Sequence, residues 1–366
     1  MSLAVFIAAA LASFLSGWIM IKVAITDTPV ARSSHILPTP TAGGVAIFIA
    51  IVSLFGLSHA GGASVFGADP IGLGHESFVL ILGCLGLIGG IGLLDDIYNI
   101  GVKVKLIFMI FAAVISAAYL GPIKSLPIGA AAAGLPLWLG YGGAALWIFT
   151  VINVVNFTDG ANGMMGLNMG AAAIAMLALI LLSTGSLAFW LNGGLNAGLS
   201  GAPITAAWSA ALLAGLLGFL PFNARHKARL FAGDAGALIT GYLYAVIVLI
   251  AVIEMPETGV LYLGPLFILP LMTEVFLTLQ RRVRAGHNPF VAHNDHVFQR
   301  LIRSGQSHLR VSAVYLGATL CVCLAGLLAE HFHIARSPAF LIAASVIAAL
   351  IYYRQLRKTA LDLREE

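Results

Sequence analysis

Eleven runs of mostly apolar residues, each close to the length of a membrane-crossing helix, divide this chain of 366 residues. A hydrocarbon core roughly 30 Å thick needs about 20 helical residues. Only 9% of the residues are charged and the mean hydropathy is +0.99, whereas soluble domains carry about 25% charged residues. The sequence therefore predicts an all-α, polytopic integral membrane bundle with about eleven transmembrane helices. The predicted spans are residues 3–24, 43–58, 77–94, 104–120, 135–152, 167–185, 204–221, 235–253, 261–279, 310–329 and 338–353.

The distribution of Lys and Arg predicts how these spans are oriented. Eleven spans that alternate from an outside N-terminus leave Lys124 and Arg336 outside and place 17 of the 19 Lys and Arg inside, as the positive-inside rule requires. We therefore expect a periplasmic N-terminus and a cytoplasmic C-terminus. The longest inner loop, residues 281–309, is short for a separate domain, so residues 1–366 are expected to form one membrane-embedded domain.

The cysteines and the basic loops argue against a disulfide framework, a zinc site and a nucleic-acid partner. Cys84, Cys321 and Cys323 all fall inside predicted spans, where they indicate neither a disulfide framework nor a zinc site. The basic inner loops suit the anionic lipid of a bilayer surface, so we expect the lipid bilayer, and no nucleic acid, as a partner.

A pair of aspartates, Asp95 and Asp96, ends the third predicted span. Adjacent carboxylates repel and stay ionised only beside a cation or hydrogen-bond donors, so a divalent metal is one interpretation and a solvated helix end is the other. Lys103 and Lys105 begin the next span, where they could hold phosphate oxygens near such a metal. Lysines that reach for the membrane interface would give the same pattern.

Two further inner segments combine amides, carboxylates and glycines. Asn153, Asn156 and Asp159 stand at the end of the fifth predicted span, followed by glycines and without Lys or Arg. This pattern predicts a loop for hydrogen bonding and close backbone approach. Asp234 begins the eighth span within Gly-Asp-Ala-Gly, after the basic run 225–229. One carboxylate there suits Mg²⁺, which takes one or two carboxylates and completes its shell with water and phosphate.

The largest inner loop, residues 281–309, carries His293, His296 and Arg300. The two histidines could bind zinc, bind phosphate or transfer protons. Because no cysteine and no clear third ligand lie nearby, we favour a contact to phosphate or sugar, with a merely basic loop as the alternative. Glu274 lies inside the ninth predicted span, where an acid is a functional candidate by default.

The first inner loop is rich in proline and therefore predicted to be non-helical. It adds Asp27, Arg32 and His35 to the inner face. Six polar stretches far apart in the sequence are thus expected to meet on one side of the membrane.

In this order, the segments resemble the polyprenyl-phosphate N-acetylhexosamine-1-phosphate transferases, glycosyltransferase family 4, over nearly the whole chain. The resemblance implies transfer of N-acetylhexosamine 1-phosphate from a UDP-linked N-acetylhexosamine to undecaprenyl phosphate at the cytoplasmic face of the bacterial inner membrane. The products would be a lipid-linked pyrophosphate sugar and UMP. Mg²⁺ would be required, with Mn²⁺ as an alternative. The first inner loop and the segment 296–301 look like the branch that initiates O-antigen, a lipopolysaccharide component, or a related cell-envelope polysaccharide.

The resemblance also implies residue roles. Asp95, Asp96 and Asp159 are the expected catalytic residues, and Asp234, helped by Asp95, is the expected metal ligand. The expected substrate-binding residues are Asn153, Asn156, Lys103, Lys105, His293, His296 and Arg300.

Three positions depart from the family pattern. Asn162 stands where a second Asp is usual, Ala237 where Ser is usual, and Glu274 where Asp is common. Direct attack by the lipid phosphate and a covalent aspartyl intermediate both stay open, as do the identity of the hexosamine and a homodimer.

Two other functions compete with the transferase. A proton- or cation-coupled transporter would place ionisable residues near the bilayer midplane on broken, repeated helices, whereas most of the acids here lie at span ends. A non-enzymatic scaffold gives no reason for acidic and amide-rich motifs to converge.

Overall fold

The computed structural model describes residues 3–23, 26–27, 38–60, 74–183, 204–288 and 293–362. Arg32 and His35 lie outside these ranges, and so does the side chain of Asp27. The helices of the described part are α1 (Leu3–Val23), α2 (Gly43–Ala60), α3 (Gly74–Tyr98), α4 (Val102–Leu120), α5 (Leu137–Thr158), α6 (Met164–Ser183), α8 (Ile204–Asn223), α9 (Gly233–Glu254), α10 (Val260–Phe267), α11 (Leu269–Arg284), α12 (Val297–Arg303), α13 (His308–His331), the 3-10 turn Ile334–Arg336, and α14 (Pro338–Asp362).

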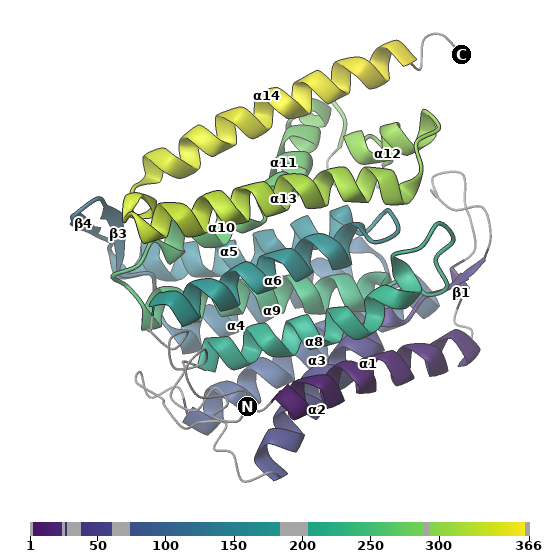
Figure 1. Cartoon of the computed structure of the whole chain (residues 1–366), viewed down its shortest axis with the longest axis horizontal. Helices are drawn as coiled ribbons and strands as arrows, with labels where there is room; N and C mark the ends of the chain where they lie inside the picture. Colours follow the sequence, from purple (N-terminus) through teal and green to yellow (C-terminus); the bar gives the residue numbers. More distant parts are fainter. Residues whose placement is uncertain are drawn as a thin grey trace.

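Strands are short and lie at the ends of the bundle (Figure 1). β1 (Thr26–Asp27) pairs antiparallel with β2 (Thr39–Pro40). β3 (Ser125–Ile128) and β4 (Ala131–Gly134) form an antiparallel hairpin. The hairpin β3–β4 and β1 stand at opposite ends of the long helices, which run roughly along one direction.

The predicted helical membrane architecture is confirmed. Within the described ranges, ten helices are long and apolar enough to cross a membrane, and the pair α10 and α11 makes an eleventh span if it is counted as one. The ninth span, expected to be continuous over residues 261–279, is instead bent by 70° between α10 and α11. Pro270 accounts for the break, because proline lacks an N–H and is tolerated in the first turn of a new helix.

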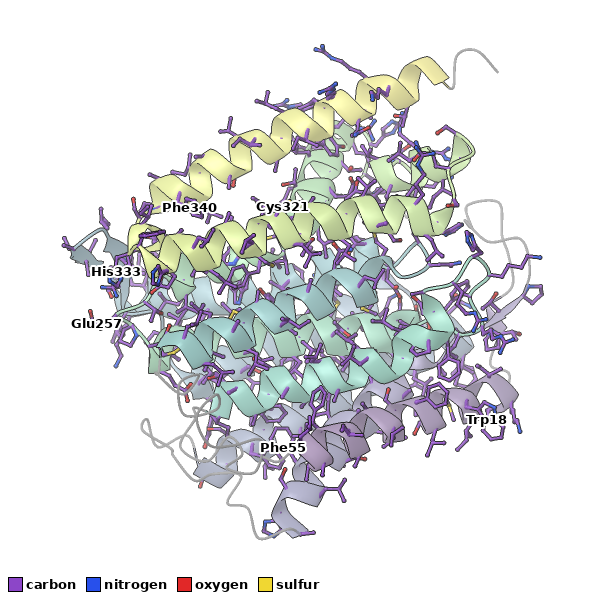
Figure 2. The ribbon with its side chains drawn as sticks, in the orientation of Figure 1. Trp18, Phe55, Glu257, Cys321, His333 and Phe340 are labelled. Atoms are coloured by element: carbon purple, nitrogen blue, oxygen red, sulfur yellow. The ribbon has the colours of Figure 1, made fainter. Side chains whose placement is uncertain are left out.

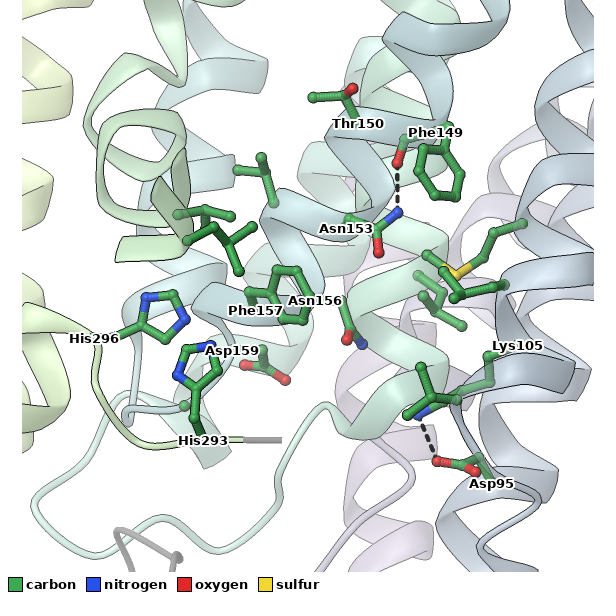
Figure 3. Close-up of a pocket in the computed structure, with 18 of the residues that line it drawn as sticks. Asp95, Lys105, Phe149, Thr150, Asn153, Asn156, Phe157, Asp159, His293 and His296 are labelled. Atoms are coloured by element: carbon green, nitrogen blue, oxygen red, sulfur yellow. Dashed lines mark hydrogen bonds and ion pairs between the residues drawn. The ribbon is translucent and has the colours of Figure 1, made fainter. Parts of the chain in front are cut away.

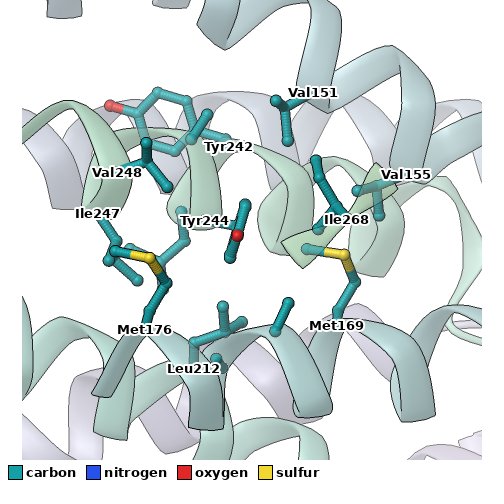
Figure 4. Packing of buried hydrophobic residues seen from close by; sticks show 14 of the residues in the cluster. Val151, Val155, Met169, Met176, Leu212, Tyr242, Tyr244, Ile247, Val248 and Ile268 are labelled. Carbon is teal, nitrogen blue, oxygen red and sulfur yellow. The ribbon is translucent and has the colours of Figure 1, made fainter. Parts of the chain in front are cut away.

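Helix α9 is the centre of the bundle. In its apolar window 89% of the residues are buried, against 6% for α14. Figure 4 shows Tyr242 and Tyr244 of α9 among apolar side chains from neighbouring helices, including Val151, Met169 and Leu212. These side chains belong to α5, α6 and α8, so α9 is enclosed on several sides by protein.

The outer helices present apolar side chains to their surroundings. Trp18 on α1 and Phe340 at the start of α14 lie at the periphery in Figure 2. Trp18 is 49% exposed, and much of the remaining surface of α1 is Leu, Ile and Phe. A surface of this kind suits contact with lipid tails.

Close packing brings α3 and α9 together near the site. A Cβ atom at Gly92 on α3 would collide with the backbone of Asp234 and Ala235 at the start of α9. Small residues permit this approach, which is common between membrane helices. The end of α3 and the beginning of α9 therefore lie side by side, and their aspartates with them.

Candidate active site

A cavity of about 580 Å³ opens where α3 and α5 end and α4 and α9 begin. The loop before α12 and part of α11 complete its wall. Figure 3 shows Asp95 and Lys105 at one end, His293 and His296 at the other, and Asp159 between them. The structure thus brings together residues from three of the predicted polar stretches, and Asp234 adds a fourth through its contacts with Lys105 and Asn156. Of the predicted site residues, those that line the cavity are Asp95, Lys105, Asn153, Asn156, Asp159, His293 and His296.

Lys105 links two carboxylates at the charged end. Its ammonium donates to Asp95 Oδ2 at 2.7 Å and also to Asp234. Asn156 Nδ2 donates to the other oxygen of Asp234 at 3.1 Å, and Gly101 N donates to Asp95 Oδ1 at 3.1 Å. Two oxygens from helices far apart in the sequence therefore share one positive charge.

The side chain of Asp96 points toward the start of α9, whereas that of its neighbour Asp95 lines the cavity. Its carboxylate accepts hydrogen bonds from the backbone N–H groups of Asp234 at 3.0 Å and Ala235 at 3.5 Å, so it caps the start of α9. Gly233 permits this contact: its φ is +68°, and a Cβ atom there would collide with the Asp96 carboxylate. Successive helical residues point about 100° apart, so the paired aspartates serve different partners.

The amide motif lies on a helix, where we expected a loop. α5 continues to Thr158, because Val154 and Val155 are buried and maintain its helical packing. Asn153 and Asn156 then share one face of the last turns, three residues apart. Asn153 Nδ2 donates to the carbonyl of Phe149 on the same helix at 2.8 Å, and both amides face the cavity (Figure 3).

Asp159 follows directly after α5 and lines the cavity. Burial, and then the negative charges of Asp234 and Asp96, raise the pKa of Asp159 to about 7. Both effects disfavour the ionised carboxylate. Asp159 can therefore accept or release a proton near neutral pH.

Three arginines hold the loop before α12. Arg281 donates to the carbonyl oxygen of Asp295 at 2.6 Å, Arg300 Nε donates to the same oxygen at 3.3 Å, and Arg282 pairs with the Asp295 carboxylate. Burial alone would raise the pKa of Asp295, but the hydrogen bond and charge of Arg282 lower it. The loop is thus fixed to the end of α11 by ionic contacts.

The two predicted histidines stack on each other at the cavity. The ring centroids of His293 and His296 are 5.0 Å apart, with 26° between the ring planes. Burial, followed by the charges of His296 and Arg282, lowers the pKa of His293 to about 4. A neutral His293 can both donate and accept a hydrogen bond to a sugar or nucleotide at neutral pH.

Four predicted site residues are placed elsewhere. Among the described residues, Asp96, Lys103, Asp234 and Arg300 do not line the cavity. Asp234 is joined to it through Lys105 and Asn156. Lys103 is exposed on the first turn of α4, and Arg300 contacts Asp295.

The cavity also contains residues that the sequence analysis missed. Gln299 lines it, and its Oε1 accepts from the backbone N–H of His296 at 3.3 Å. Val275, Phe276 and Leu279 form part of an apolar wall. Their helical spacing of one and four residues was a signal for a shared face, but it does not distinguish a cavity wall from a lipid-facing surface.

Asn162 and Ala237, two departures from the family pattern, have structural explanations. The amide of Asn162 donates to the carbonyls of Arg225 at 2.9 Å and His226 at 3.2 Å, which joins two inner loops. A carboxylate could not donate these bonds. Ala237 is buried on α9, where a small side chain fits the crowded packing.

Comparison with known proteins places these features in a family. The family model described as Glycosyl transferase family 4 matches residues 78–252. A decaprenyl-phosphate N-acetylglucosaminephosphotransferase of Mycobacterium tuberculosis (strain H37Rv) is 30% identical over 308 residues, which cover 77% of this chain and 70% of the relative. The undecaprenyl-phosphate alpha-N-acetylglucosaminyl 1-phosphate transferase of Salmonella typhi is 26% identical over 334 residues, 87% of this chain and 80% of the relative. The equivalent protein of Escherichia coli (strain K12) is 25% identical over 342 residues, 90% and 83%.

Proposed function

The chain belongs to glycosyl transferase family 4, and we propose that it transfers N-acetylhexosamine 1-phosphate from a UDP-sugar to undecaprenyl phosphate. A phosphate oxygen of the lipid attacks the β-phosphorus of the donor, the bond from that phosphorus to the bridging oxygen breaks, and UMP leaves with the oxygen. The lipid-linked product would begin O-antigen or a related envelope polysaccharide. The names of the relatives specify N-acetylglucosamine, so UDP-GlcNAc is the first donor to test.

The observation that supports this proposal most is that the cavity combines a charged end with an apolar wall. Asp95 and Lys105 lie beside Leu106 and Met109 on its lining. Phe276 also lines it and is 45% exposed on the outer surface of α11. A polyprenyl phosphate could therefore enter from the lipid side, while a nucleotide sugar reaches the same carboxylates from water.

Mg²⁺ is the proposed cofactor, with Mn²⁺ as an alternative. The residues fit such an ion, because the ammonium of Lys105 already occupies a point where Asp95 and Asp234 stabilise positive charge. Mg²⁺ in proteins is often bound by one or two carboxylates plus phosphate and water. When bound, it would offset the charge that develops on the leaving UMP.

The side chains around this point receive distinct proposed roles. Asp234 and Asp95 would hold the metal, and Lys105 would bind phosphate oxygens once it is released from them. Asn156 orients Asp234 through its 3.1 Å hydrogen bond. Asp159, whose pKa is about 7, would exchange a proton with the substrates or stabilise charge near them.

The geometry favours indirect roles for the remaining predicted residues. Asp96 would position Asp234 by capping α9, and Arg300 would hold the loop that carries the histidines. His293 and His296, with Asn153, would contact the sugar or nucleotide. Lys103 would bind phosphate only after a change of rotamer toward the cavity.

The enzyme is proposed to lie in the bacterial inner membrane and to have the option of forming a homodimer. We place the chain in the bacterial inner membrane with the cavity on the cytoplasmic side, because the positive-inside rule puts the cavity end there. A homodimer would bury some of the apolar outer surface of helices such as α1, and mass measurement in nanodiscs would detect it. The transporter alternative has no support from the family to which the chain belongs.

Purified protein in nanodiscs tests the proposed reaction. Labelled UDP-GlcNAc, undecaprenyl phosphate and Mg²⁺ should give a lipid-linked product that is lost on addition of EDTA and in Asp234→Asn. UDP-GalNAc, UDP-QuiNAc and UDP-FucNAc form the donor panel. Lys358→Gln, a change at an exposed lysine of α14, serves as the control and should retain most of the activity. Absence of lipid-linked sugar with every donor would refute the proposal.

A further inference from the structure

The carboxylate of Glu274 joins four helices behind the cavity. It is 1% exposed on α11, accepts from the backbone N–H of Val297 on α12 at 2.6 Å, and accepts from the hydroxyl of Tyr315 on α13. Thr278 Oγ1 lies 3.4 Å from the carboxylate and 2.8 Å from the hydroxyl of Tyr352 on α14. Glu274 is not on the cavity wall among the described residues, so it touches the site through other groups.

One of those groups is His296, which does line the cavity. Its Nδ1 lies 3.3 Å from Glu274 Oε1. The nitrogen is buried and forms no hydrogen bond with a described residue. The backbone N–H of Gln299, in the capping box at the start of α12, also faces the ring, but its partial charge is smaller than the full charge of the carboxylate. The ring is 2% exposed, lies in the stack with His293, and its centroid is also 5.5 Å from that of Phe298. The imidazole is therefore held between rings, with one nitrogen directed at a carboxylate.

This arrangement selects one form of the imidazole. A lone pair on Nδ1 facing a carboxylate oxygen at 3.3 Å would be repelled, whereas an Nδ1–H is attracted and needs only a small rotation to donate. A carboxylate on one ring nitrogen commonly fixes the tautomer and leaves the other nitrogen for function. The remaining Nε2 then carries a lone pair.

We propose that Glu274 is a positioning residue for sugar-nucleotide binding: it fixes His296 as the Nδ1–H tautomer, so that Nε2 accepts a hydrogen bond from a hydroxyl or N–H group of the donor. The same carboxylate also accepts from the backbone N–H of Val297 and so fixes the start of α12. Because His296 directly precedes Val297, this contact also fixes the position of the imidazole at the cavity. This inference rests on the proposed function only for the identity of the bound ligand.

The charge of Glu274 is more than these structural contacts require. A glutamine in its place could accept from Val297 N through its oxygen and donate to the oxygen of Tyr315 through its nitrogen, because a hydroxyl both donates and accepts. Burying a carboxylate costs free energy that an amide does not cost. What glutamine cannot reproduce is the negative charge beside Nδ1, so the charge is explained by its effect on His296.

The test compares Glu274→Gln with two matched variants. Glu274→Asp keeps the charge and shortens the side chain, and Tyr315→Phe removes a hydrogen bond from the same carboxylate but leaves the charge. Nitrogen NMR of histidine-labelled protein in nanodiscs reports the tautomer of His296, with the signal assigned by its loss in His296→Gln. Initial rates at varied UDP-GlcNAc give KM and kcat separately.

We expect Glu274→Gln to mix the two tautomers of His296. It should also lower kcat/KM for the donor, mainly through KM, by ~10–100-fold, the range known for loss of the carboxylates that orient metal-binding histidines. Glu274→Asp should recover part of this loss, and Tyr315→Phe should keep the wild-type tautomer and KM.

Several results would overturn the inference. An unchanged tautomer in Glu274→Gln would do so, and so would a changed tautomer with an unchanged KM. Equal loss in Tyr315→Phe would show a structural role alone. If Glu274→Gln does not fold, His296→Gln carries the test, and an unchanged KM for UDP-GlcNAc there would overturn the proposal. If the wild type has no transferase activity, the proposed function fails, while NMR still decides whether Glu274 sets the tautomer.

Discussion

The carboxylate of Asp96 accepts a 3.0 Å hydrogen bond from the backbone N–H of Asp234. The contact ties the last turn of α3 to the first turn of α9. The side chain of Asp234 pairs with Lys105. Asp96 therefore positions the Asp234 carboxylate through the backbone, although Asp96 does not line the cavity.

Removal of Asp96 should therefore affect stability, and removal of Asp95 should not. Asp96→Ala deletes a helix cap, which typically costs about 0.5–2 kcal/mol, and it should lower the melting temperature in detergent. Asp95→Ala should abolish transfer with little change in melting temperature, because Asp95 contacts the exposed end of α4 and the cavity. Equal destabilisation by the two variants would contradict the division of roles.

Lys105 should compete with a divalent metal in the absence of substrates. Its ammonium lies 2.7 Å from Asp95 and also contacts Asp234. At such distances a unit charge is worth several kcal/mol even at an effective dielectric constant of about 20, so Lys105→Met should tighten Mn²⁺ binding by roughly tenfold or more. Electron paramagnetic resonance of free Mn²⁺ measures this affinity.

The same variant should lose transfer activity, because the phosphate contact is gone. Tighter metal binding together with slower turnover is the distinctive result. Lys103→Met, at an exposed position on the first turn of α4, is the control and should leave Mn²⁺ affinity unchanged. Weaker Mn²⁺ binding in Lys105→Met would show that the two cations do not share this site.

His293 should make stability depend on pH in the acidic range. Its pKa is about 4 in the folded protein against 6.5 as a reference. Between these values the unfolded state binds more protons, so stability rises with pH across this window and is lost as pH falls toward 4. His293→Gln should reduce the drop in melting temperature between pH 7 and pH 5, whereas His287→Gln, at an exposed position, should not.

An aspartate at position 162, the usual family residue, should destabilise this chain. Asn162→Asp would turn a carboxylate toward the carbonyl oxygens of Arg225 and His226, in place of two donated hydrogen bonds. An unsatisfied buried polar group costs about 1–3 kcal/mol. Thermal unfolding should show this loss, and Asn99→Asp, at an exposed position, should not. A wild-type melting temperature in Asn162→Asp would mean that the inner loops rearrange.

Much of this architecture follows from the sequence because bilayer thickness fixes helix length. Apolar runs predicted the spans, and the alternation of spans predicted that Asp95, Asp159 and Asp234 would meet at one end. These are statements about which side a residue occupies, and they need no knowledge of packing.

The details that failed depend on packing and on local backbone geometry. Nothing in the pair Asp95 and Asp96 says which carboxylate faces the cavity, because that depends on how α3 is rotated against α9. The end of α5 was placed too early, since Asn153 and Asn156 are polar although they continue the helix. The break at Ile268 was readable from Pro270, but the apolar run around it concealed the interruption.

The central position of α9 has a consequence for biogenesis. The ribosome delivers α3, α4 and α5 to the membrane before α9, so Lys105 and Asn156 are made before Asp234, whose carboxylate they contact in the folded protein. Because 89% of the residues in the apolar window of α9 are buried, we expect this helix to pack against protein soon after it enters the membrane. We therefore expect that, in a nascent chain released after Glu254, the earlier helices already protect α9 from lipid-soluble crosslinkers, although α14 has not been made.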